Sequence, residues 1–157
     1  MTGTALRERV LAGETVRGAM VFEFFSPGIG RILELAGAEY ALFDMEHTGL
    51  GLETLKSLCA GCRGLSVAPM ARVPRGEYHF IARALDVGVH GVMVPMVESA
   101  AQARAIAEAM RYPPEGRRGA AFGFAHDHYA GGDVLTTMRA ANARNIAIGS
   151  MTLDPAI

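Results

Sequence analysis

The chain has 157 residues, of which 50% are hydrophobic and 20% are charged, a balance typical of a soluble globular domain with its own core. Its 15 basic and 16 acidic residues give a net charge of −1, which provides no electrostatic basis for binding nucleic acid or an anionic membrane. No apolar run approaches the roughly 20 residues of a membrane span. The N-terminal segment 1–14 also lacks the apolar core of a signal peptide. We therefore expect a cytoplasmic protein that has no nucleic-acid or membrane partner.

Short apolar runs alternate with amphipathic stretches along the chain. The first run, 15–25, is predicted to be a strand that ends at a Ser-Pro-Gly turn, and 28–37 is predicted to be a helix that Gly37 ends. The same alternation then repeats. Further strands are predicted at 39–46, 65–73, 91–97 and 145–149. Further helices are predicted at 52–62, 78–88, 98–112 and 134–143.

The predicted strands are continuous apolar runs, which indicates burial on both faces and a parallel sheet covered by helices. Such βα units fit a doubly wound sheet or a (β/α)₈ barrel, but no G-x-G-x-x-G turn follows the first strand. Polar residues at successive strand ends favour the barrel, whose active sites lie at that rim. These residues are Glu23, Asp44, Glu46, His47, Arg72 and Glu98. We predict one α/β domain over 1–157, the N-terminal portion of a TIM-type barrel with about five βα units and no closure, because a complete barrel needs about 250 residues.

Three ionisable side chains follow the strand predicted at 39–46. Asp44 and Glu46 share a face of the strand end, and His47 lies at the turn. A carboxylate near an imidazole can fix its tautomer and raise its basicity, which would suit acid/base catalysis. The alternative is structural, with His47 and Glu46 capping the next helix and Asp44 accepting buried hydrogen bonds.

Arg72 ends the apolar run of the third predicted strand, where a buried guanidinium needs an anion. It could pair with Asp44 or Glu46, or it could hold a substrate carboxylate or oxyanion. We favour the second reading. Glu98 opens a predicted helix, where a carboxylate is stabilised by the helix dipole, and we prefer this structural reading to a catalytic role.

Two further motifs have an ordinary structural interpretation. Cys59 and Cys62 form a C-x-x-C pair that closes a predicted helix, whereas a redox pair would open one. We therefore interpret them as small apolar residues. The segment 126–129, "HDHY", offers metal-ligating side chains but no third ligand at a defined spacing, so we interpret it as a solvated or subunit-contact loop.

Four motifs together resemble the HpcH/HpaI family of metal-dependent 2-oxo-acid aldolases, which are related to citrate lyase β-subunits. They are "FDMEHTGL" (43–50), "APMARVP" (68–74), "LDVGVHGVMVPMVESAAQA" (85–103) and "RYPPEGRRG" (111–119). The resemblance implies a (β/α)₈ barrel that cleaves 4-hydroxy-2-oxo acids into pyruvate and an aldehyde. It also implies a higher homo-oligomer and a divalent metal, Mg²⁺ or Mn²⁺, that stabilises the enolate as a Lewis acid.

The resemblance also implies a role for each matching residue. His47 matches the family's acid/base histidine, Asp44 matches the carboxylate that orients this histidine, and Arg72 matches the arginine that stabilises charge on the pyruvate oxygen. Glu46 lies within the motif but receives no chemical step. The family's metal ligands are a Glu in a Q-[IV]-E motif after the fifth strand and an Asp after the sixth.

The sequence departs from this pattern at its end. No Gln or Glu follows Glu115, and the segment 149–157 diverges from the family, with Asp154 as its one acidic residue. We therefore expect a truncated family member that lacks both metal carboxylates, binds the metal weakly and has little activity alone. Two alternatives stay open: a non-catalytic partial barrel that acts as a scaffold or subunit, and a CoA-thioester lyase of the same superfamily, for which Arg117–Gly119 offers the one basic cluster.

Overall fold

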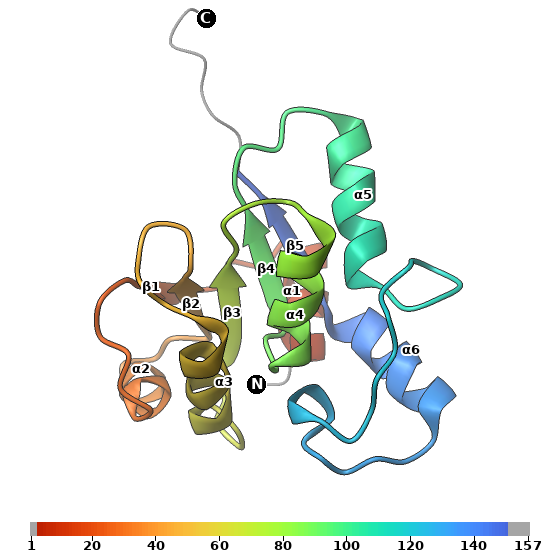
Figure 1. The fold of residues 1–157 in the computed structure, drawn as a ribbon. Helices are drawn as coiled ribbons and strands as arrows, with labels where there is room; N and C mark the ends of the chain where they lie inside the picture. Colours follow the sequence, from red (N-terminus) through yellow and green to blue (C-terminus); the bar gives the residue numbers. More distant parts are fainter. Residues whose placement is uncertain (1–2, 151–157) are drawn as a thin grey trace, which may run out of the picture.

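The computed structural model describes residues 3–150, which form one five-stranded sheet flanked by helices (Figure 1). The strands are β1 (Gly18–Val21), β2 (Tyr40–Asp44), β3 (Ala68–Arg72), β4 (Gly91–Val94) and β5 (Ile146–Gly149). The α-helices are α1 (Gly3–Leu11), α2 (Ile29–Leu35), α3 (Leu52–Gly61), α4 (Tyr78–Asp86), α5 (Ala100–Met110) and α6 (Val134–Arg144). A short 3₁₀ helix, η1 (Ala125–Asp127), precedes α6.

The strands lie in chain order, β1-β2-β3-β4-β5, and every neighbouring pair is parallel. A doubly wound sheet would instead reverse its strand order at a switch point. Sequential parallel order is the arrangement of a (β/α)₈ barrel, in which each strand lies beside the previous one. Within residues 3–150 the sheet is open, and β1 and β5 form its two edges.

The sheet has a different core on each face, because side chains alternate across a strand. One face carries Phe43, Ala71 and Val92, which pack with Leu55 of α3 and Ile81 of α4 in the main core. Figure 1 shows α4 in front of the strands and α1 behind them.

The other face carries Leu42, Ala68 and Met70, which form a smaller core with Leu6 of α1. This face would line the interior of a closed barrel. Leu6 is only 1% exposed, so α1 covers part of the face. No helix is predicted at 1–14, because a helix that buries a single large side chain shows little periodicity. No helix within the described part of the chain is long and apolar enough to cross a membrane.

The predicted strands are longer than the observed ones. The first was expected over 15–25, but β1 covers only Gly18–Val21. Phe22 and Phe24 continue the apolar run beyond the strand, yet they are 45% and 80% exposed. Apolar content therefore overestimated this strand, since an apolar loop residue cannot be distinguished from a strand residue by hydrophobicity alone.

Candidate active site

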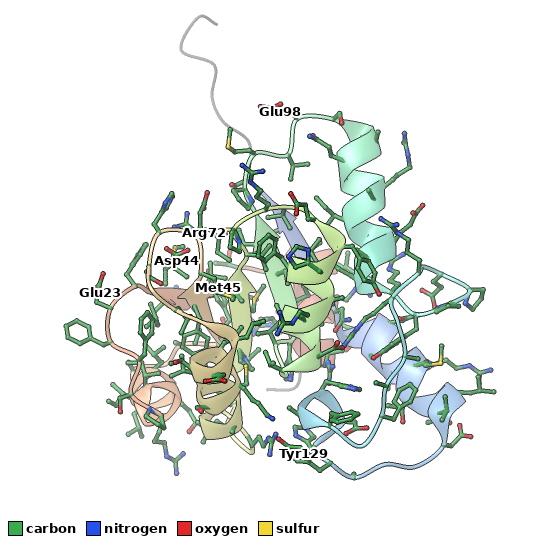
Figure 2. The ribbon with its side chains drawn as sticks, viewed as in Figure 1. Glu23, Asp44, Met45, Arg72, Glu98 and Tyr129 are labelled. Atoms are coloured by element: carbon green, nitrogen blue, oxygen red, sulfur yellow. The ribbon has the colours of Figure 1, made fainter. Side chains whose placement is uncertain are left out.

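The second and third strands bring Asp44 and Arg72 side by side. The register of β2 and β3 pairs Asp44 with Arg72 at the last position of both strands. Figure 2 shows the two side chains together at this end of the sheet. Because the strands are parallel, their carboxyl ends share one rim, which is the edge where (β/α)₈ enzymes carry their active sites.

Asp44 is fully buried and organises the turn that follows β2. Its Oδ1 accepts a hydrogen bond from the backbone N–H of Glu46 at 3.0 Å, and its Oδ2 accepts one from His47 at 3.1 Å. The hydroxyl of Thr48 donates to the carbonyl oxygen of Asp44. The motif "FDMEHTG" therefore folds as a turn built around one carboxylate, as Asp side chains commonly arrange.

Arg72 forms a forked ion pair with this carboxylate. Its Nε donates to Oδ1 of Asp44 at 2.7 Å and its Nη2 donates to Oδ2 at 3.0 Å. The Nε atom also lies 3.2 Å from Oε2 of Glu46, so the guanidinium bridges two carboxylates. The Nη1 atom makes no hydrogen bond to any residue between 3 and 150 and keeps its donors for another acceptor. The structural ion pair that we considered the less favoured reading is thus present.

His47 projects from this network into solvent. Its side chain is 67% exposed, and its Nε2 lies 3.5 Å from Oε2 of Glu46. The resemblance assigned the orienting role to Asp44, whereas the carboxylate beside the ring is that of Glu46. Asp44 holds the backbone of His47 instead. The alternation rule had already placed Asp44 and Glu46 on one face, and this signal could have assigned Glu46 to the site.

The charges of the network reinforce one another. Burial by itself would raise the pKa of Asp44, but the hydrogen bonds from Arg72 and from the N–H groups of Glu46 and His47 together lower it below its ordinary value. The hydrogen bond to Asp44 raises the pKa of Arg72. Asp44 is therefore a permanent anion, and Arg72 a permanent cation, in the range where enzymes work.

This geometry can perform two chemical tasks. The unpaired Nη1 donors of Arg72 can bind a carboxylate or a developing oxyanion, because the forked pair with Asp44 holds the guanidinium plane still. The exposed imidazole of His47, beside the carboxylate of Glu46, can accept and return a proton. Both tasks fall at the same rim, on neighbouring strands.

The carboxylates of this rim are poor candidates for metal ligands. Both oxygens of Asp44 are occupied by Arg72 and by backbone N–H groups, and Glu46 interacts with Arg72 and His47. No group of three or more His, Cys, Asp or Glu side chains in the described part of the chain is arranged to hold a metal ion. These residues do not fit the divalent metal that the resemblance implies, and we assign no step to it.

The other polar residues predicted for the rim do not join the network. Glu23 and Glu98 are exposed, and Figure 2 shows both at a distance from Asp44 and Arg72. Glu98 donates its backbone N–H to Oε1 of Gln102, beside the capping box that Ser99 and Gln102 form at the start of α5.

Cys59 and Cys62 are free and buried, as their interpretation as small apolar residues requires. Burial raises the pKa of both thiols, to about 11 for Cys62, so neither is a reactive thiolate near neutral pH.

The interpretation of 126–129 as a solvated or subunit-contact loop is wrong for His126, which is buried within the chain itself. His126 is only 4% exposed, and its Nε2 lies 2.6 Å from the carbonyl oxygen of Ala121. The carboxylate of Asp127 accepts hydrogen bonds from the N–H groups of Gly123 and Tyr129. His126 and Asp127 belong to η1, where these internal contacts satisfy their polar groups, whereas His128 follows η1 and is exposed.

Comparison with known proteins assigns the chain to a family. Residues 20–151 match the family described as HpcH/HpaI aldolase/citrate lyase. The chain belongs to this family. The hydroxypyruvate/pyruvate aldolase of Roseovarius nubinhibens is 38% identical over 108 residues, which cover 68% of this chain and 42% of that protein. The 5-keto-4-deoxy-D-glucarate aldolase of Klebsiella pneumoniae is 38% identical over 106 residues, covering 63% of this chain and 41% of that protein.

A solved structure agrees with the sequence relatives. The crystal structure of an HpcH/HpaI aldolase from Desulfitobacterium hafniense superposes with a TM-score of 0.87 at 26% identity, covering 93% of this chain and 56% of that one. This likeness and the strand order confirm the predicted barrel-type fold, of which residues 3–150 form an open five-stranded part. The chain spans about half the length of the relatives that it matches.

Proposed function

We propose that this chain carries the acid/base and oxyanion-binding half of a carbon–carbon lyase of the class II aldolase type. The proposed substrates are 4-hydroxy-2-oxo acids, and the products are pyruvate and an aldehyde. The observation that carries this proposal is the network of Asp44, Arg72, Glu46 and His47 at the carboxyl ends of β2 and β3. Relatives that are named aldolases support the reaction class.

The proposed reaction uses each group for one task. His47 accepts the proton of the 4-hydroxyl group, the bond between C3 and C4 breaks, and its electron pair passes into the enolate of pyruvate. The free Nη1 donors of Arg72 stabilise the negative charge on the enolate oxygen. The 4-hydroxyl carbon becomes the aldehyde, and His47 returns the proton to the enolate carbon, which yields pyruvate. Asp44 is a positioning residue, because it holds Arg72 and the backbone of His47 but keeps no free oxygen for substrate.

Pyruvate release from a 4-hydroxy-2-oxo acid tests this function, measured on the 157-residue chain with and without added Mn²⁺. We expect His47→Ala to lower kcat/KM by about 10²- to 10⁴-fold, the usual contribution of a general acid/base. Arg72→Lys should also lower it, because an ammonium cannot pair with Asp44 as a fork and still offer planar donors.

The matched control is His79→Ala, which removes an exposed histidine of α4 outside the network and should leave the rate unchanged. Absence of pyruvate release by the unaltered chain under both conditions would reject lyase activity of this chain by itself and favour the second candidate function. Equal rates for the His47 and His79 variants would reject the role of His47.

A second candidate function is a non-catalytic subunit that completes a barrel with another chain or another copy. The open edges at β1 and β5 favour it, and so does the absence of a three-donor metal group from residues 3–150. Turnover by the unaltered chain alone rejects this candidate. A CoA-thioester lyase has less support, since Arg118 of the predicted basic cluster is 1% exposed and donates to Asp86.

A further inference from the structure

A hollow of about 440 Å³ lies at the opposite end of the sheet from the candidate active site. Its walls come from the end of α3, the turn before β4, η1 and the end of α6. Four basic side chains line it: Arg63, His90, His128 and Arg144. We refer to these four residues and the space between them as the basic hollow. Its apolar wall includes Leu65, Val67 and Pro69, so it has room for more than an ion.

The positive charge of the basic hollow is not neutralised by the described residues. None of the residues that line it is an Asp or a Glu. The acidic side chain beside His128 in sequence is Asp127, and its carboxylate is occupied by the N–H groups of Gly123 and Tyr129. Arg63 donates to the carbonyl oxygen of Ala125 at 3.4 Å and lies over the ring of Tyr129, which are contacts that leave its charge in place.

Two buried atoms of the hollow lack hydrogen-bond partners. Nδ1 of His90 and Nε of Arg144 are both buried and make no hydrogen bond to residues 3–150. Such orphaned polar atoms are rare in proteins, because each one costs the desolvation of a polar group. Burial, together with the nearby charges of Arg144 and His128, lowers the pKa of His90 to about 3. Burial and the charge of Arg118 likewise lower the pKa of Arg144.

We propose that the basic hollow binds a small anion of the phosphate class, either inorganic phosphate or the phosphate group of a small organic ester. Guanidinium groups recognise phosphate oxygens through paired N–H donors, and two of them converge here with two imidazoles. A bound phosphate would accept a hydrogen bond from Nε of Arg144, and its negative charge would offset the positive charge of the two arginines. The volume lies within the range of small-molecule pockets, which allows an organic group beside the apolar wall.

This site is separate from the proposed lyase site. Pro69 lines the hollow near the start of β3, whereas Arg72 ends the same strand at the opposite rim. Occupation of the hollow would therefore tie α3, β4 and α6 together without blocking His47. Its test does not depend on turnover.

Calorimetric titration of the full chain with inorganic phosphate, and separately with glycerol 3-phosphate, tests the proposal against sodium chloride at equal ionic strength. We expect saturable binding of at least one phosphate compound and none of chloride. Tighter binding of inorganic phosphate would assign the free ion, and tighter binding of the ester would assign an organic phosphate. No saturable binding of either compound would overturn the proposal.

Substitutions locate the binding to the hollow. Arg144→Met should weaken phosphate binding at least tenfold and should still fold, because it removes a buried charge that lacks a counterion. Arg63→Met, at an exposed position, provides a second variant that does not threaten the core, and it should also weaken binding. The matched control is Arg139→Met on the exposed side of α6, which should bind as the unaltered chain does. Equal weakening by the control, or unchanged binding in both hollow variants, would overturn the proposal.

Discussion

At the residue scale, one buried carboxylate organises the candidate active site. Asp44 accepts two backbone N–H groups and both arms of the Arg72 fork, so the turn and the arginine are held by the same side chain. The catalytic groups proposed here, His47 and Arg72, therefore depend on a residue that has no free oxygen for substrate. Because the pKa of Asp44 is lowered, its carboxylate stays charged until strongly acidic pH, where protonation would release Arg72 and the turn.

Asp44→Asn should reduce the free energy of unfolding by about 3 kcal/mol at pH 7, because it leaves Arg72 without its buried counterion. The folded-state pKa of Asp44 lies below its ordinary value of 3.8, so its stabilising effect is complete above that pH and is lost as the pH falls through the folded pKa. Urea unfolding at pH 7 and at pH 3 measures both effects, and the difference between the two proteins should narrow in acid. A constant difference across this range would contradict the role of the charge. Glu98→Gln, at an exposed carboxylate, is the control.

At the element scale, α1 is the one helix that packs on the inner face of the sheet, among the elements described for residues 3–150. It does so mainly through Leu6, which contacts the cluster of Leu42, Ala68 and Met70. The remaining helices cover the outer face or extend beyond it, as in any βα unit. Without α1, the apolar side chains that β2 and β3 present on the inner face of the sheet would face water.

Leu6→Ala should lower the free energy of unfolding by about 2–5 kcal/mol, the usual cost of removing a fully buried leucine side chain. The same substitution at Leu11, which is 68% exposed on the same helix, should change it by less than about 0.5 kcal/mol. Urea titration followed by circular dichroism measures both variants. Similar values for the two would show that α1 does not contribute to the core in solution.

At the scale of the whole molecule, the open sheet is the dominant feature. Among residues 3–150, β1 and β5 each have a strand partner on one side only, and such edges pair readily with other strands. Ile148 of β5 is 36% exposed and stands at one of these edges. Phe24 and Leu35 add exposed apolar surface near the other edge, and they are 80% and 79% exposed.

We therefore expect the chain to associate with itself, which is one of the two ways in which the second candidate function would complete a barrel. Size-exclusion chromatography with light scattering should give a mass above the 16.7 kDa of one chain. Ile148→Lys should shift the mass toward that of a monomer, because a lysine on an edge strand opposes further pairing. Leu135→Lys, at an exposed position on α6, is the control. A stable monomer of the unaltered chain would exclude this mode of association.

Although the sequence by itself missed α1 and wrongly added Glu23 and Glu98 to the rim cluster, it determined the order of the five strands, the parallel sheet and the place of Asp44, His47 and Arg72 at strand ends. It could do so because apolar periodicity and strand-end position are local properties, and Asp44, His47 and Arg72 lie within short motifs. The tertiary structure decided which carboxylate serves which partner, since the fork between Asp44 and Arg72 depends on the register of β2 and β3. It also placed Glu46 beside His47, covered the inner face with α1, and brought Arg63, His90 and Arg144 together from distant segments. Apart from the contact between the neighbours Glu46 and His47, these contacts join segments that are distant in sequence, and no local pattern in the chain encodes them.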